Sequence, residues 1–172
     1  MNPWRLLYFH TIQFIGGISL HYESDKHKNS HPLPPSEANG YPFFSWAGLR
    51  IIEAKDGHST IELDVQHHHR GGGGTDAVNG GIVAYMFDGL LGTAVRSIWT
   101  DDIVGQVTIT LNIQYQRMIA AKHRIVGHGR VVRAGSSMVF VEGEILDESG
   151  QVAAECTGIY RIFRKKEDSK LE

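Results

Sequence analysis

The sequence is poor in cysteine, in long apolar runs and in excess charge of either sign. Cys156 is its one cysteine, which excludes an internal disulfide framework and favours a reducing, cytoplasmic location. No uncharged apolar run reaches the roughly 18 residues of a membrane-spanning helix, so no membrane partner is expected. Seventeen basic side chains stand against nineteen acidic ones, a net charge of -2, and this balance predicts no nucleic-acid partner.

Glycine, by contrast, is abundant. It accounts for 20 of the 172 residues, about 12% against a usual ~7%, so some segments need backbone freedom or a close approach of the backbone. Hydrophobic residues make up 41% and charged residues 21%, which is typical of a globular protein. The length suits one domain with a substantial core.

The chain divides into an N-terminal extension, one domain and a tail. Residues 1–22 are apolar but interrupted by polar side chains, and no Ala-x-Ala-type cleavage site follows, which disfavours a signal peptide. Residues 23–40 are rich in Pro, Ser and Asn, as linkers are. We therefore expect residues 1–40 to form an extension and linker, 41–165 the folded domain, and 166–172 a charged tail. The alternative is an extension that packs on the domain.

The domain begins with a short helical turn and a hairpin. The aromatic residues 41–46 suit one or two helical turns, and segments 49–54 and 59–66 are predicted strands around a Lys-Asp-Gly turn. In the second strand, apolar and polar residues alternate, which predicts one buried face.

One long helix and four strands follow. Residues 80–98 are apolar around nearly the whole circumference of a helix, so other elements should wrap it. Apolar and polar residues alternate over 105–115, and further strands are expected at 123–133, 137–147 and 152–163, with hairpin turns between the last three. These elements predict an α+β fold in which an antiparallel sheet curls around one central helix.

A glycine motif opens the predicted helix. In the segment AVNGGIVAYMFDGLLGTAV, Asn79 precedes Gly80 and Gly81, and Asp88 lies eight positions beyond the first glycine. With the later segment TLNIQY and the order of elements, this motif resembles the hotdog-fold thioesterases, specifically the PaaI-like acyl-CoA thioesterases. The resemblance covers about residues 43–163 and implies the hotdog fold. This chain departs from the family in carrying Asn79 where the family usually has His.

The glycine pair suits the binding of an oxyanion. A helix N-terminus presents unpaired N–H groups and partial positive charge, and glycine has no side chain to block a thioester carbonyl. The amides of Gly80 and Gly81 are therefore predicted to hold the oxyanion of a tetrahedral intermediate. The alternative is a plain turn entering a packed helix, although each glycine costs about 1 kcal/mol of helix propensity.

Asp88 is the candidate nucleophile or general base. Every other side chain in YMFDGLLG is apolar or absent, and a carboxylate in a buried helix needs a partner or a function. The alternative is a structural carboxylate. The resemblance adds Thr108, at a family Ser/Thr position four residues before Asn112, where a hydroxyl would position water, although β propensity also explains a strand threonine. Asn79 would hold the loop or bond the thioester carbonyl.

The remaining polar residues are weaker candidates. His67, His68 and His69 are consecutive and lack acidic or cysteine companions, so no metal site is expected. Cys156 has no obvious base nearby and is predicted to be a small core residue. His69 or Arg70 is predicted to border the acyl or CoA channel. Arg130 and Arg133, just before the turn at Gly135, are candidates to contact the CoA phosphates, and the alternative is a solvated strand end. An aromatic or an aliphatic acyl pocket is compatible with Tyr85, Phe87, Trp99 and Met118.

We therefore expect hydrolysis of acyl-CoA or acyl-carrier thioesters to free acid and thiol, with no metal or bound cofactor. The alternatives are a hotdog acyl-thioester dehydratase or hydratase, and a non-catalytic acyl-CoA-binding module. Eight residues of helix span about 12 Å, so Asp88 cannot comfortably reach a carbonyl held at Gly80 of its own helix. The two groups are predicted to meet across a two-fold axis in an obligate homodimer, which pairs again if the protein is a tetramer.

Overall fold

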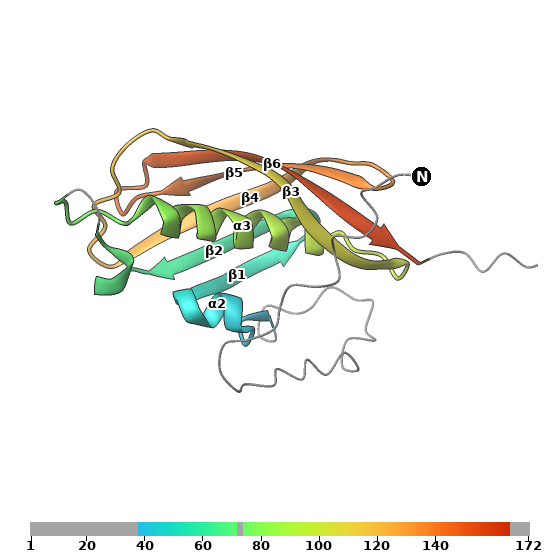
Figure 1. Cartoon of the computed structure of the whole chain (residues 1–172), viewed down its shortest axis with the longest axis horizontal. Coiled ribbons are helices and arrows are strands. Elements are labelled where there is room, and N and C mark those ends of the chain that lie inside the picture. Colours follow the sequence, from blue (N-terminus) through green and yellow to red (C-terminus); the bar gives the residue numbers. More distant parts are fainter. Residues whose placement is uncertain (1–37, 72–73, 166–172) are drawn as a thin grey trace, which may run out of the picture.

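The computed structural model describes residues 38–71 and 74–165 (Figure 1). The predictions for residues 1–37 and for the charged tail 166–172 lie outside the described residues. Within the described ranges, no helix is long and apolar enough to cross a membrane. The elements lie within two residues of the predicted bounds: α2 (Pro42–Ala47), β1 (Leu49–Lys55), β2 (His58–Asp64), α3 (Gly80–Arg96), β3 (Ile103–Tyr115), β4 (Arg124–Ala134), β5 (Met138–Leu146) and β6 (Val152–Arg164).

The six strands form one antiparallel sheet in the order β1-β2-β4-β5-β6-β3. Although β3 directly follows the helix in the chain, it lies at the edge of the sheet beside β6. The two edge strands are therefore β1 and β3. Figure 1 shows α3 lying across one face of this sheet, which confirms the predicted α+β architecture.

The close packing of α3 on the sheet explains part of the glycine content. A Cβ added at Gly127 would lie 2.9 Å from Leu90 Cδ2, and one at Gly143 would lie 3.0 Å from Leu91 Cδ2. Glycine at these sheet positions therefore lets fully buried helix leucines reach the strands. On another side of the helix, the Phe43 and Phe44 rings of α2 lie against Gly89. The helix is thus covered by the sheet and α2. The side of the helix that carries Ala84, Tyr85, Asp88 and Gly92 stays half-buried.

A β-bulge divides β3 into two parts that present different faces. Thr108 pairs with Tyr160 and Thr110 pairs with Ile159, so Ile109 is an extra residue in the ladder. Beyond the bulge, Leu111 packs against the core, as the alternation predicts. Before it, Val107 is 45% exposed, and Ile109 itself is 49% exposed. A single alternation over 105–115 is therefore wrong, because the bulge turns Thr108 onto the helix face of the sheet.

Candidate active site

The start of α3 is built around the N-cap residue Asn79. Its Oδ1 accepts a hydrogen bond from the Gly81 N–H at 2.8 Å, and its Nδ2 donates to the Gly71 carbonyl at 2.9 Å. Its main-chain N–H donates to the His69 carbonyl at 2.9 Å. Asn79 therefore caps the helix and holds the preceding loop against it.

Capping leaves Gly80 with the available donor of the glycine pair. The Gly81 N–H is engaged by Asn79, whereas no hydrogen bond from the Gly80 N–H is found among the described residues. Tyr115 of β3 donates through its hydroxyl to the Gly80 carbonyl at 2.8 Å, and a Cβ at Gly80 would lie 3.5 Å from the Tyr115 ring. The first turn of α3 thus offers one free donor, the Gly80 N–H, beside the ring of Tyr115.

Two turns further along α3, Asp88 meets β3 and β6. The Thr108 hydroxyl donates to Asp88 Oδ1 at 2.7 Å. The Tyr160 hydroxyl lies 3.1 Å from the Asp88 carbonyl oxygen and 3.4 Å from Oδ1. Burial, with the Asp88 carboxylate nearby, raises the pKa of Tyr160 far above its usual range, so its hydroxyl remains a donor. In the described part of the chain, no hydrogen bond to Asp88 Oδ2 is found.

The predicted channel residues His69 and Arg70 are engaged within the protein. His69 is 1% exposed, and its Nδ1 accepts the Gln66 N–H at 2.9 Å. Burial lowers the pKa of His69, so the ring is neutral at neutral pH. Arg70 donates to the carbonyls of Asp76 at 2.8 Å and Ala121 at 2.7 Å. Both side chains brace the segment that leads into α3. No cluster of three or more potential metal ligands occurs within 38–71 and 74–165.

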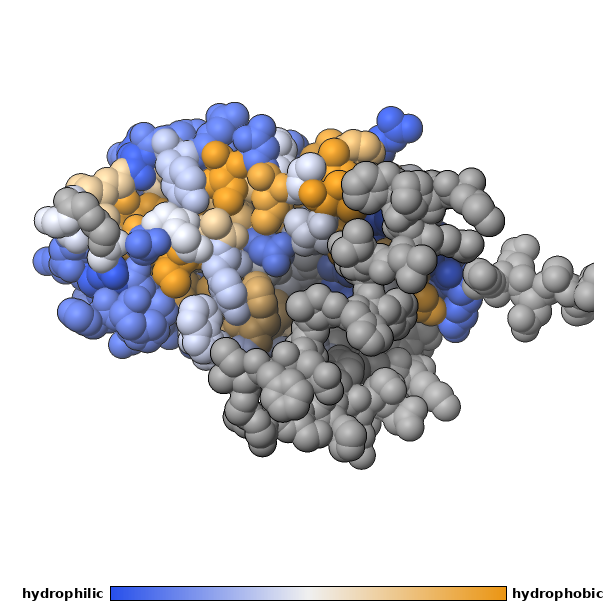
Figure 2. Space-filling model, in the orientation of Figure 1, coloured by the Kyte–Doolittle hydropathy of each residue, from blue (hydrophilic) through white to orange (hydrophobic). Residues whose placement is uncertain are grey.

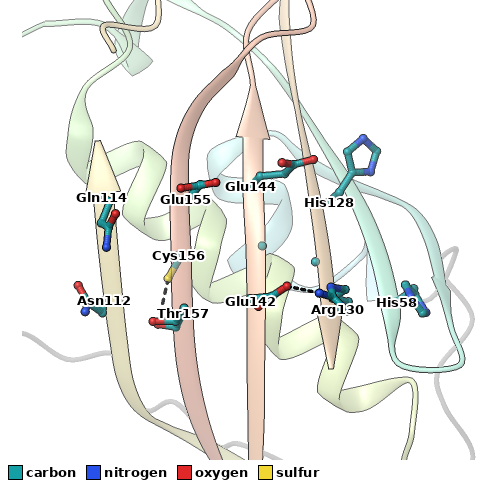
Figure 3. Close-up of a pocket in the computed structure, with 12 residues that line it drawn as sticks. His58, Asn112, Gln114, His128, Arg130, Glu142, Glu144, Glu155, Cys156 and Thr157 are labelled. Carbon is teal, nitrogen blue, oxygen red and sulfur yellow. Dashed lines mark hydrogen bonds and ion pairs between the residues drawn. The ribbon is translucent and has the colours of Figure 1, made fainter. Parts of the chain in front are cut away.

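The predicted phosphate contacts lie elsewhere on the sheet. Arg130 forms an ion pair with Glu142 beside a depression of about 450 Å³. Figure 3 shows these side chains on one face of the sheet with α3 behind the other, so Arg130 and Asp88 are not brought together within one chain. Arg133 is exposed near the end of β4, and Gly135 lies in the following turn, where its N–H donates to the Met138 carbonyl at 2.8 Å.

Aromatic side chains cluster one turn before Asp88. The Tyr85 ring stacks on Phe43 with centroids 4.1 Å apart, and its hydroxyl donates to the Phe43 carbonyl at 2.6 Å. Trp46, whose ring lies 5.4 Å from that of Tyr85, is 69% exposed. Phe87, in contrast, is fully buried in the core, so the expectation that it lines an acyl pocket is wrong.

Two site residues, Tyr115 and Tyr160, were missed at the sequence level. Tyr115 is the last residue of the TLNIQY segment, which already belonged to the family resemblance. Its place in that segment was a usable signal for a site residue. Tyr160 is brought to Asp88 by a cross-strand pairing between distant segments, for which no local pattern exists. Cys156, predicted as a core residue, is 2% exposed, and burial raises the pKa of its thiol to about 11.

Comparison with known proteins adds the family context. A sequence profile described as the thioesterase superfamily matches residues 76–154. A Halobacterium salinarum protein, provisionally named an esterase, is 30% identical over 142 residues, which cover 77% of this chain and 91% of that protein. The E. coli PaaI protein, from the phenylacetic acid degradation operon, superposes with a TM-score of 0.65 at 17% identity, covering 76% of this chain and 89% of PaaI. A hypothetical thioesterase from Streptococcus pneumoniae, solved with coenzyme A, superposes with a TM-score of 0.60 at 19% identity. The match covers 69% of this chain and 88% of that protein.

Proposed function

The chain belongs to the thioesterase superfamily of hotdog-fold hydrolases, and we propose that it hydrolyses acyl-CoA thioesters with Asp88 and Gly80 as its catalytic groups. The observation that carries the proposal is the environment of Asp88. This half-buried carboxylate stands in an apolar helix, with Oδ1 bonded to Thr108 and Oδ2 free of protein donors in the described residues. Oδ2 is not among the buried side-chain atoms that lack a partner in the described residues, so it is open to water and to a substrate.

The proposed reaction is addition to the thioester carbonyl followed by elimination of the thiol. A water molecule attacks the carbonyl carbon while Asp88 takes its proton, or Asp88 itself attacks. The Gly80 N–H stabilises the oxyanion that forms. Collapse of this intermediate breaks the C–S bond, and the thiolate leaves and is protonated. The water route then releases the acid, whereas the nucleophile route leaves an anhydride on Asp88, which one water molecule cleaves in a second step.

The distance between the two groups calls for a homodimer. Residues 80 and 88 are separated by about 12 Å of helix, which is too far for one substrate carbonyl to meet both in one chain. The edge strand β3 exposes Val104, Val107 and Ile109, and Figure 2 shows hydrophobic residues along the course of β3. Antiparallel pairing of two β3 edges about a two-fold axis would bring each Gly80 towards the partner's Asp88.

Coenzyme A is the proposed thiol. The Streptococcus pneumoniae neighbour was solved with coenzyme A, which supports this choice over a carrier protein. Arg133 is exposed and has no charged partner among the described residues, so it remains a candidate for the CoA phosphates, with Gly135 in the adjacent turn. Arg130 would first have to leave Glu142.

The alternative function, a dehydratase or hydratase, requires an accessible catalytic histidine at the site. His69 precedes the glycine motif, but its ring is buried and its Nδ1 already accepts a backbone N–H. A catalytic acid or base must reach substrate within about 3 Å, directly or through one water. The buried ring of His69 therefore favours thioester hydrolysis with Asp88 as the acting group.

The test is thiol release from a panel of short, long and aromatic acyl-CoAs. We expect turnover by the wild type, loss of kcat in Asp88→Asn, and wild-type kcat in Asp64→Asn, a matched change at an exposed carboxylate. Acyl-CoA binding without thiol release would instead support a binding module. Interconversion of enoyl- and hydroxyacyl-CoA without thiol release would support a dehydratase.

A further inference from the structure

We propose that Tyr160 is a positioning residue for Asp88, acting with Thr108 to commit Oδ1 of the carboxylate to the protein and so reserve Oδ2 for the reaction. The catalytic meaning of this inference rests on the proposed function. The positioning itself is a property of the folded chain and can be tested separately.

The geometry brings three oxygen atoms together at one point. Thr108 Oγ1 lies 2.7 Å from Asp88 Oδ1, and Tyr160 Oη lies 3.4 Å from the same atom. The single hydroxyl hydrogen of Tyr160 is shared, with its shorter contact to the Asp88 carbonyl at 3.1 Å and its longer contact to Oδ1. The Thr108 hydrogen bond, together with the longer Tyr160 contact on the same oxygen, restricts rotation of the carboxylate about its Cβ–Cγ bond.

The sheet and the helix both contribute to this arrangement. Thr108 and Tyr160 are directly paired across β3 and β6 and therefore share a face of the sheet, and the bulge at Ile109 puts Thr108 on the same face as Leu111. On the helix, Gly92 follows Asp88 by one turn, and a Cβ there would lie 3.6 Å from Tyr160 Cε1 and 3.8 Å from its hydroxyl. These are ordinary contact distances, so the Tyr160 ring packs directly beside this turn of the helix.

Burial makes Tyr160 a dependable anchor. Its side chain is 2% exposed, so water does not compete for its hydroxyl and the ring has little freedom to move. The free oxygen, Oδ2, is then the atom that accepts a proton from water or attacks the carbonyl carbon. A misplacement of reactive groups by about 1 Å can lower the rate about 10²-fold. The orientation of the Asp88 carboxylate should therefore affect kcat.

Kinetics of Tyr160→Phe test the inference, because this change removes the hydroxyl and keeps the ring. We expect kcat to fall about 3- to 10-fold with KM unchanged, since the hydroxyl does not touch the substrate. Thr108→Val should have a larger effect, and the double variant should lose less than the product of the single losses because both hydroxyls act on one oxygen. Ser59→Ala is the matched control, since it removes a buried hydroxyl that donates to the Leu90 carbonyl of α3 at 2.7 Å.

Crystal structures of Tyr160→Phe and of the double variant supply a readout that does not depend on activity. We expect the Asp88 carboxylate to turn or to split into conformers in the double variant and to stay fixed in Ser59→Ala. Wild-type kcat in Tyr160→Phe, or an unmoved Asp88 in the double variant, would overturn the inference. If the wild type releases no thiol while Asp88 turns as expected, the proposed function fails and the positioning role stands.

Discussion

Asn79 Oδ1 accepts the Gly81 N–H at 2.8 Å, and this bond gives the two glycines of the motif different roles. Gly81 belongs to the cap, and a Cβ there would lie 3.0 Å from Asn79 Oδ1. Gly80 keeps a free N–H in the described structure and lies beside Tyr115. The oxyanion predicted at both amides is therefore assigned to Gly80 in the proposed mechanism.

Replacing Gly80 by Val is expected to lower kcat by about 10²–10³, the scale of losing one oxyanion donor, because the branched side chain crowds the carbonyl. Gly80→Ala should fold normally, since its Cβ would make an ordinary 3.5 Å contact with Tyr115, and should lose less activity. Thiol-release kinetics and thermal unfolding check both variants. Wild-type kcat in a folded Gly80→Val would make Gly80 a turn residue only.

Replacing Asn79 should separate stability from activity. Asn79→Ala removes the cap and is expected to cost about 1 kcal/mol of stability. Asn79→Asp keeps an acceptor for the Gly81 N–H and adds negative charge at the helix start, so it should be more stable than Asn79→Ala. The same charge disfavours an oxyanion at Gly80, and kcat should fall at least ~10-fold. Denaturant unfolding and kinetics measure the two effects, and equal activity in Asn79→Asp and wild type would argue against an oxyanion there.

The elements and their order were predictable because each depends on local patterns. The largely apolar stretch 80–98, the alternation in 59–66 and the turn residues of the hairpins are all local signals that lie within a few residues of one another. The place of β3 at the far edge required knowledge of the fold family, since chain order alone does not determine strand order.

The details of the site depended on contacts between distant segments. The bulge at Ile109 has no signature in an alternating sequence, and without it Thr108 would be assigned to the opposite face from Leu111. Asp88 was expected in a fully buried helix, yet the strip it occupies is half-buried in one chain. Arg130 was a reasonable phosphate ligand by charge, but cross-strand pairing with Glu142 became visible only in the register of β4 and β5.

The Glu148 carboxylate forms an acid-sensitive brace, because it accepts hydrogen bonds from the backbone N–H groups of His123 and Arg124 at the start of β4. Backbone N–H groups of Lys122, Arg124 and His123 lower the pKa of Glu148 from 4.5 to about 2. Because the folded state binds this proton less readily than the unfolded state, the brace is intact above about pH 4.5 and is lost as the pH falls towards 2. Tm should therefore fall less steeply with acidification in Glu148→Gln than in the wild type, with Glu53→Gln as the exposed control. Parallel curves for Glu148→Gln and the wild type would contradict this.

Two exposed isoleucines on opposite edges of the sheet test which edge forms the dimer. Ile109 on β3 is 49% exposed and Ile52 on β1 is 48% exposed, so they are closely matched. Ile109→Asp should shift the protein to monomers and lower activity, because like charges would face each other across the two-fold axis. Ile52→Asp should leave both unchanged. Light scattering measures the mass of the assembly, and thiol release measures activity. If only Ile52→Asp dissociated the dimer, the interface would be at β1 and not at β3.

Subunit mixing tests whether one active site takes Gly80 from one chain and Asp88 from its partner. Asp88→Asn and Gly80→Val are each expected to be nearly inactive as homodimers. After exchange, a mixed dimer holds one site with both defects and one site with neither, so it should have half of wild-type activity. Equal mixing makes half of the dimers mixed, and the whole sample should therefore recover about one quarter of wild-type activity. Differently tagged subunits verify exchange by co-purification, and an Asp88→Asn sample mixed with itself is the control. If exchange is complete and activity stays at the level of the homodimers, Gly80 and Asp88 must act within one subunit, and the carbonyl would have to lie where about 12 Å of helix separates them.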